Sequence, residues 1–145
     1  MIPSTSIIAA LSADSVIAAT ATGGLYPYDI RAAGRLASPA AFDADGMVIP
    51  ALSILDRGSL RSSLDGPAMT REVIHIYAFA PLSDAGYAAV DTLIGRVTDV
   101  LHGWQDPVTG AQAFHAGRVG KTIVKDMVFD RLTFSAGSIL AVSRW

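Results

Sequence analysis

The sequence predicts a single α+β domain, residues 1–145, in which an antiparallel or mixed sheet of about four strands carries two main helices on one face. Two observations lead to this prediction: residues 83–103 have a clear helical pattern, and residues 71–80, just before them, have a strand pattern. The length of 145 residues is typical of one domain. The expected order is helix, strand, strand, helix, strand, strand.

The first helix is expected over residues 4–21, where apolar side chains recur on roughly one helical face. Asp14 and Ser15 are expected to divide it into two short helices, and Gly23 with Gly24 to end it. Residues 25–45 show no clear pattern and are expected to form a long connection with at most one short strand. A connection of this length is usually functional.

The next segments have strand character. Residues 47–55 are apolar, and Pro50 among them indicates an edge strand or a bulge. Residues 56–69 are rich in Gly, Ser, Arg and Asp, which predicts an exposed hairpin arm. Residues 71–80 form the clearest strand, with Tyr77 and Phe79 on one face and Ile74 and Ile76 on the other. Because both faces are apolar, both should be covered.

The helix over residues 83–103 should anchor the fold. Its apolar stripe would contribute on the order of 10 kcal/mol gross on burial. The stripe consists of Tyr87, Val90, Ile94, Val97 and Leu101. Beyond Gly103, residues 104–120 are expected to be irregular, and residues 121–129 and 132–145 to form the last two strands.

Composition limits the function. The chain has no cysteine, which excludes disulfides and thiolate metal sites and fits a reducing cytoplasm. The net charge is −2 with no basic run, which argues against tight nucleic-acid binding, and no stretch approaches the roughly 20 apolar residues of a membrane span. A hydrophobic fraction of 51% fits either a well-filled core or surface that a partner covers.

The segment from Gly117 to Thr122 resembles the end of a phosphate-binding loop, Gly-Lys-Thr. However, that loop needs a glycine at the position of His115, and a helix after it, where this sequence predicts a strand. We therefore interpret the segment as a turn into a strand.

No constellation of residues predicts a cofactor or metal. His75, His102 and His115 lack partners at ligand spacing. Asp126 and Asp130 are expected on one face of a strand but about 13 Å apart, too far to share a proton. Asp43 and Asp45 lack the other oxygen ligands of a calcium loop. We expect no catalytic activity, although a triad of residues remote in sequence remains an alternative.

The order of elements resembles a known family. A short helix, the loop Gly24 to Pro27, a strand, a hydrophilic hairpin, the strand Glu72 to Ala78 and a helix ending in Leu-His-Gly (101–103) follow one another before a closing strand pair. This order is similar to that of the tail-terminator, or tail-completion, proteins of long-tailed bacteriophages.

The resemblance implies a structural assembly protein without cofactors. Such a protein forms a hexameric ring that caps the head-proximal end of the tail tube, ends tube growth and joins the tail to the head connector. Its partners would be copies of itself, the tube protein and a connector or stopper protein, with DNA passing through the lumen without specific binding. It would act in the host cytoplasm during assembly and then in the virion.

The subunit interface is expected to use the hairpin arm and the apolar sheet surface. Mixed charges on the arm suit reciprocal pairing between subunits better than DNA capture. The candidate interface residues are Arg57, Arg61, Asp65, Arg71 and Tyr77. Two alternatives remain open at this point: a head–tail stopper protein, and a small ferredoxin-like enzyme or ligand-binding domain, which should show a polar pocket on its sheet.

Overall fold

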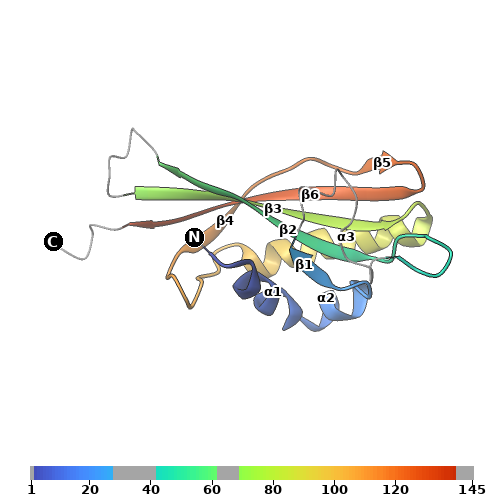
Figure 1. The fold of residues 1–145 in the computed structure, drawn as a ribbon, viewed down its shortest axis with the longest axis horizontal. Helices are drawn as coiled ribbons and strands as arrows, with labels where there is room; N and C mark the ends of the chain where they lie inside the picture. The colour runs from blue at the N-terminus through green and yellow to red at the C-terminus, as the bar shows by residue number, and fades with distance from the viewer. Residues whose placement is uncertain (1, 28–41, 62–68, 140–145) are drawn as a thin grey trace.

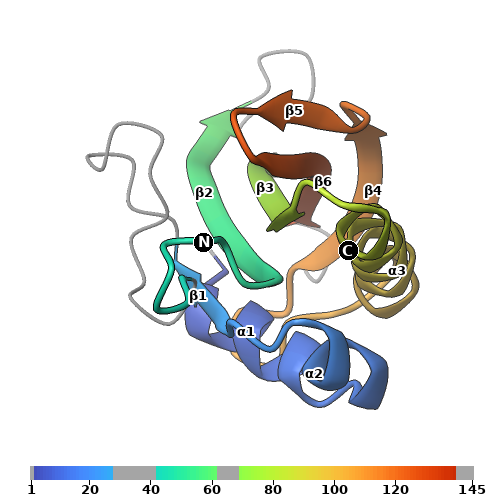
Figure 2. The same ribbon diagram turned by 90° about the vertical axis from the view of Figure 1, so that its right-hand side faces the viewer.

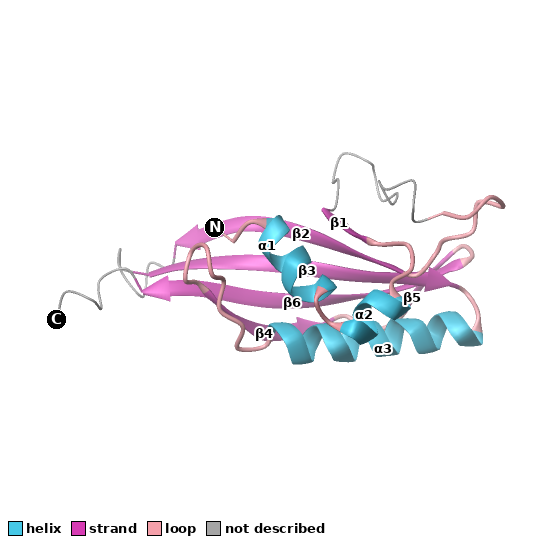
Figure 3. Ribbon diagram, turned by 90° about the horizontal axis from the view of Figure 1, so that it is seen from below, coloured by secondary structure: helices cyan, strands magenta, loops and turns pink. Residues whose placement is uncertain are grey.

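A computed structural model describes residues 2–27, 42–61 and 69–139, with the backbone alone at 56–61, 69–71 and 138–139. A six-stranded sheet carries three helices on one face (Figures 1 and 3). In chain order the elements are α1 (Ser4–Ser12), α2 (Ser15–Thr20), β1 (Leu25–Pro27), β2 (Ala51–Arg61), β3 (Met69–Pro81), α3 (Asp84–Leu101), β4 (Gln112–Arg118), β5 (Thr122–Val124) and β6 (Met127–Ile139).

The sheet is mixed, as the sequence predicts. Its strands lie in the order β1-β2-β3-β6-β4, and β5 also pairs with β6. The short strand β1 runs parallel to β2, whereas all the other pairings are antiparallel. Because β3 and β6 are the two central strands and pair over their whole length, they form the rigid middle of the domain.

The predicted number and order of elements were wrong. The described residues form six strands and three helices, where about four strands and two main helices were expected. The strand β4 lies in a segment expected to be irregular, whereas β1 agrees with the one short strand allowed within residues 25–45. The predicted strands over 121–129 and 132–145 are instead a short β5 and one continuous β6, since Lys125, with φ of 56°, makes a turn after Val124.

The predicted N-terminal helix is divided where expected. Asp14 caps α2 by accepting a hydrogen bond from the backbone N–H of Ile17 at 3.0 Å. The same carboxylate forms an ion pair with Arg96 of α3, which ties the two helices together. This hydrogen-bonded guanidinium, with the N–H of Ile17, holds the pKa of Asp14 below its usual value of 3.8.

The main core lies between the helices and the sheet. The helix α3 begins at its cap Ser83, whose hydroxyl accepts from Gly86 N–H at 3.0 Å. Four of the five predicted stripe residues are buried, and Tyr87 packs partly buried against the same core. Ile74 and Ile76 meet them from β3. The prediction that this helix anchors the fold therefore fits the packing.

The outer edge of β4 is closed by the segment that follows α3. Ala113 accepts a hydrogen bond from Gly103 N–H at 2.7 Å and donates one to the carbonyl of Trp104 at 2.8 Å. The N–H of His115 donates to Nδ1 of His102 at 3.0 Å. These bonds satisfy backbone groups that an edge strand would otherwise expose. Within the described ranges, no helix is both long and apolar enough to cross a membrane.

Candidate functional site

The face of the sheet opposite the helices, which we call the outer face, carries an aromatic cluster. Side chains alternate between the faces of a strand, so Tyr77 and Phe79 of β3 point away from Ile76 and Ala78. The rings of Tyr77 and Phe79 stack with centroids 6.0 Å apart, and Phe129 of β6 lies 6.4 and 5.9 Å from them. Since Tyr77 and Phe129 remain only partly buried, the cluster presents aromatic surface.

Polar groups lie beside these rings on the outer face. In the sheet register, Tyr77 lies opposite Ser53 of β2 on one side and Arg131 of β6 on the other. The hydroxyl of Ser53 is fully buried, and neither it nor Nε of Arg131 has a hydrogen-bond partner among the described residues. A buried polar group without a partner is costly. Both atoms are closed off from solvent, so a binding partner can reach only the outer part of Arg131, which as a residue is partly buried.

The sequence interpretation missed Arg131, although a signal for it was present. The alternation of β6 puts Phe129, Arg131 and Thr133 on the same face, where Thr133 lies 3.0 Å from Nδ1 of His75. Among the predicted interface residues, Tyr77 lies on this face. Asp65 lies outside the described residues, as do the side chains of Arg57, Arg61 and Arg71, so their role stays a prediction.

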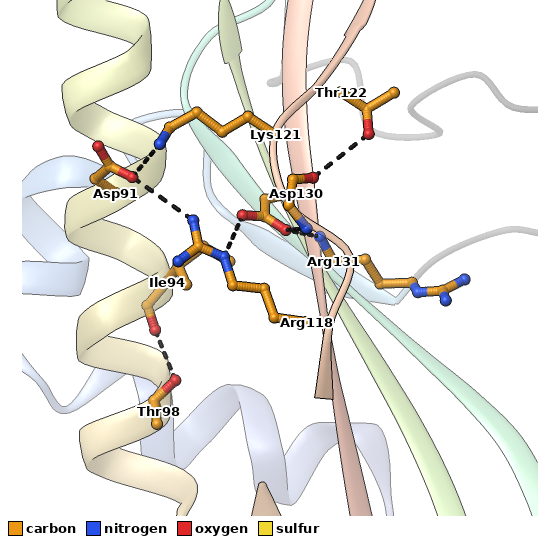
Figure 4. Close-up of polar contacts among 9 residues, drawn as sticks. Asp91, Ile94, Thr98, Arg118, Lys121, Thr122, Asp130 and Arg131 are labelled. Carbon is orange, nitrogen blue, oxygen red and sulfur yellow. Dashed lines mark hydrogen bonds and ion pairs between the residues drawn. The ribbon is translucent and has the colours of Figure 1, made fainter. Parts of the chain in front are cut away.

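The segment from Gly117 to Thr122, with its Gly-Lys-Thr, is held in an ion network (Figure 4). Asp130 of β6 is fully buried and accepts from Arg118 Nε at 2.6 Å and from Gly120 N–H at 2.9 Å. Asp91 of α3 pairs with Lys121 Nζ at 2.5 Å. The strand β5 follows, as predicted. Because carboxylates neutralise both cations, the network fixes a turn and offers no phosphate cradle.

Asp126 and Asp130 do not share a strand face. Asp126 lies in the turn between β5 and β6, and its carbonyl accepts from Leu82 N–H at 2.9 Å. Asp130 lies within β6. The expected placement of both residues on one strand was therefore wrong, since the turn at Lys125 interrupts the predicted strand.

The other candidate ligands have structural contacts. Asp43 accepts from the N–H groups of Asp45 and Met47, each at 2.9 Å, and so shapes a turn. His102 supports the β4 edge described above. In the described part of the chain, no group of three or more His, Asp or Glu side chains is placed to hold a metal ion.

Comparison with known proteins shows similarity in fold and no match in sequence. No protein-family model matches the sequence, and no curated protein sequence matches it. The fold, however, is similar to that of a chain in the solved structure "Virion of native gene transfer agent (GTA) particle", with a TM-score of 0.69 and 19% sequence identity. The alignment covers 94% of this chain and 93% of that one, so the two share a fold over nearly their whole length.

Proposed function

We propose that this chain is a structural subunit of a phage-like virion. The observation that supports this best is the likeness of fold to a chain of the gene transfer agent virion over 94% of the sequence. A likeness confined to one supersecondary motif would carry little weight, because such motifs recur in unrelated proteins. This one includes the helices, the mixed sheet and the connections between them.

Within such a particle, we propose the tail-terminator role that the resemblance of the sequence to tail-terminator proteins implies. A hexameric ring of this chain would cap the head-proximal end of the tail tube, end its growth and join it to the head connector. The outer face supports a role in assembly, because it combines partly buried aromatic rings with the partly buried Arg131. We also propose that the protein acts without catalysis or a cofactor, as the resemblance to tail-terminator proteins implies.

The test is cryo-microscopy of particles from cells that carry or lack the gene for this chain. We expect a ring of six copies at the head-proximal end of the tube. Without the gene, we expect overlong tails or tails that fail to join heads. Copies located on the connector, with tails of normal length in the deletion, would instead indicate a stopper. Copies in the capsid shell would contradict both roles.

A second test concerns the predicted arm, of which residues 62–68 lie outside the described residues. The backbone of its two flanks belongs to β2 and β3, paired as Arg61 with Thr70 and Leu60 with Arg71. We expect that replacing residues 58–67 with a short turn leaves the domain folded, as judged by circular dichroism, and prevents ring closure or tube docking. Normal tails from this variant would show that the arm is dispensable for assembly.

A further inference from the structure

The outer face and the exposed side of α3 are complementary surfaces on opposite sides of the domain. We infer that the outer face of one copy binds α3 of the next copy, so that the subunits associate head to tail. This inference rests on the proposed ring and deepens it, because it names the surfaces that meet.

The chemistry of the outer face favours a partner that supplies hydrogen-bond acceptors. Arg131 lies opposite Tyr77 in the sheet register and is only partly buried, and guanidinium groups bind carboxylates best. The adjacent aromatic rings supply apolar contact area of the kind that dominates interface energies. A partner with small side chains and carboxylates would satisfy both needs.

The exposed side of α3 has this chemistry. Its solvent-exposed residues have short side chains, which lose little conformational entropy when another surface covers them. They are Asp84, Ala85, Ala88, Asp91, Thr92, Gly95 and Asp99. Gly95 has open space where a Cβ would stand, so a neighbour can approach the helix backbone there.

Two of the three carboxylates on this side are available to a neighbouring copy. Asp91 is engaged by Lys121, whereas Asp84 forms no ion pair within the described ranges. Asp99 lies 3.5 Å from Arg96, but its side chain remains 67% exposed. Asp84 and Asp99 therefore offer charge opposite to that of Arg131, which favours α3 as the segment that covers the outer face.

The two surfaces cannot meet within one molecule. Within one copy, α3 packs against one side of the sheet (Figures 2 and 3). The alternation of β3 and β6 puts the aromatic cluster on the other side. Contact between them must join different copies through unlike surfaces. Such head-to-tail contacts generate a ring when the rotation between subunits closes, whereas like-to-like contacts stop at a dimer.

Cysteine cross-linking tests the inference cleanly, because the chain has no cysteine of its own. The variant combines Thr92→Cys on α3 with Ser135→Cys on the outer face, and a short bis-maleimide serves as the cross-linker. Ser135 lies opposite Val73 in the register, on the same face as Tyr77. Each single variant is a control, and circular dichroism with thermal melting shows whether all three fold.

We expect the double variant to give a ladder of cross-linked species up to a closed oligomer, and each single variant to stay monomeric on a denaturing gel. A dimer from Ser135→Cys alone would indicate sheet-to-sheet contact, and one from Thr92→Cys alone helix-to-helix contact; either overturns the inference. Absence of the ladder overturns it as well. If sedimentation or microscopy still shows rings in that case, the proposed function stands and only the assignment of surfaces fails.

Discussion

The buried carboxylate of Asp130 should contribute more to stability than any exposed ion pair of the same network. It accepts hydrogen bonds from Arg118 Nε at 2.6 Å, Gly120 N–H at 2.9 Å and Arg131 N–H at 2.8 Å. Asp130→Ala removes all three acceptor contacts. With about 1.5–3 kcal/mol for the charged hydrogen bond and about 1 kcal/mol for each backbone donor, the gross loss is about 4 kcal/mol. Arg118 is 41% exposed and can regain water, so we expect a net loss of about 3 kcal/mol.

Urea unfolding followed by circular dichroism measures this loss, since the free energy of unfolding falls linearly with denaturant. The matched control is Asp91→Asn, which removes the pair with Lys121. Asp91 is 55% exposed, so its loss should stay below about 1 kcal/mol. If Asp130→Ala lowers the free energy of unfolding by no more than this control does, with an unchanged denaturant slope, the network does not stabilise the turn and our interpretation of it is wrong.

Three further outcomes are expected. Ile94→Ala should lower the free energy of unfolding by about 2–5 kcal/mol in the same urea assay, since Ile94 is 4% exposed in the main core; a loss below about 0.5 kcal/mol would contradict that packing. The lowered pKa of Asp14 means that its ion pair with Arg96 stabilises the fold above about pH 3.8 and is lost as pH falls through the lower, folded-state value. The stability difference between wild type and Asp14→Asn should therefore shrink to nothing in acid titrations, and a constant difference would contradict it. Arg131→Glu should abolish association in sedimentation, whereas Tyr77→Phe, which keeps the ring, should preserve it; association unchanged in Arg131→Glu would exclude the outer face from the interface.

The features predicted correctly from the sequence depend on neighbours in the chain. Asp14 caps a helix three residues away, and the core stripe of α3 repeats every three or four residues, so both patterns are visible locally. The inner face of β3 was equally visible, because Ile74 and Ile76 alternate with outward-facing residues. Short-range rules of this kind require no knowledge of the fold.

The features that were missed depend on remote contacts. In β4, Ala113 is the single buried residue, and the strand exists because β6 pairs with it on one side and the segment after α3 on the other. The short strand allowed within residues 25–45 was not given a position, because the three residues of β1 are too few to show a period and join the sheet through β2. The burial of Asp130 was also invisible, since an aspartate in a strand pattern ordinarily faces water.

Arg131 could have been placed by alternation, yet its significance depends on what the fold leaves around it. Periodicity alone puts it beside Phe129 on one face of β6. The absence of a hydrogen-bond partner for its Nε among the described residues appears only when the sheet is assembled, with Tyr77 opposite it. A sequence can thus predict the face on which such a residue lies, whereas its burial and its hydrogen-bond partners depend on the folded sheet.

The dependence of association on salt distinguishes the two contributions that the outer face would make. With a net charge of only −2, repulsion between copies is weak, so added salt has little repulsion to screen. If Arg131 pairs with carboxylates of α3, rising ionic strength should slow the association of copies. The dissociation rate should change less, because salt screens a buried ion pair less than it screens charges on two copies that are still separated by solvent. Stopped-flow light scattering at low and high sodium chloride measures both rates.

Faster association at high salt would mean that the aromatic cluster acts alone, and that the carboxylates of α3 do not face Arg131.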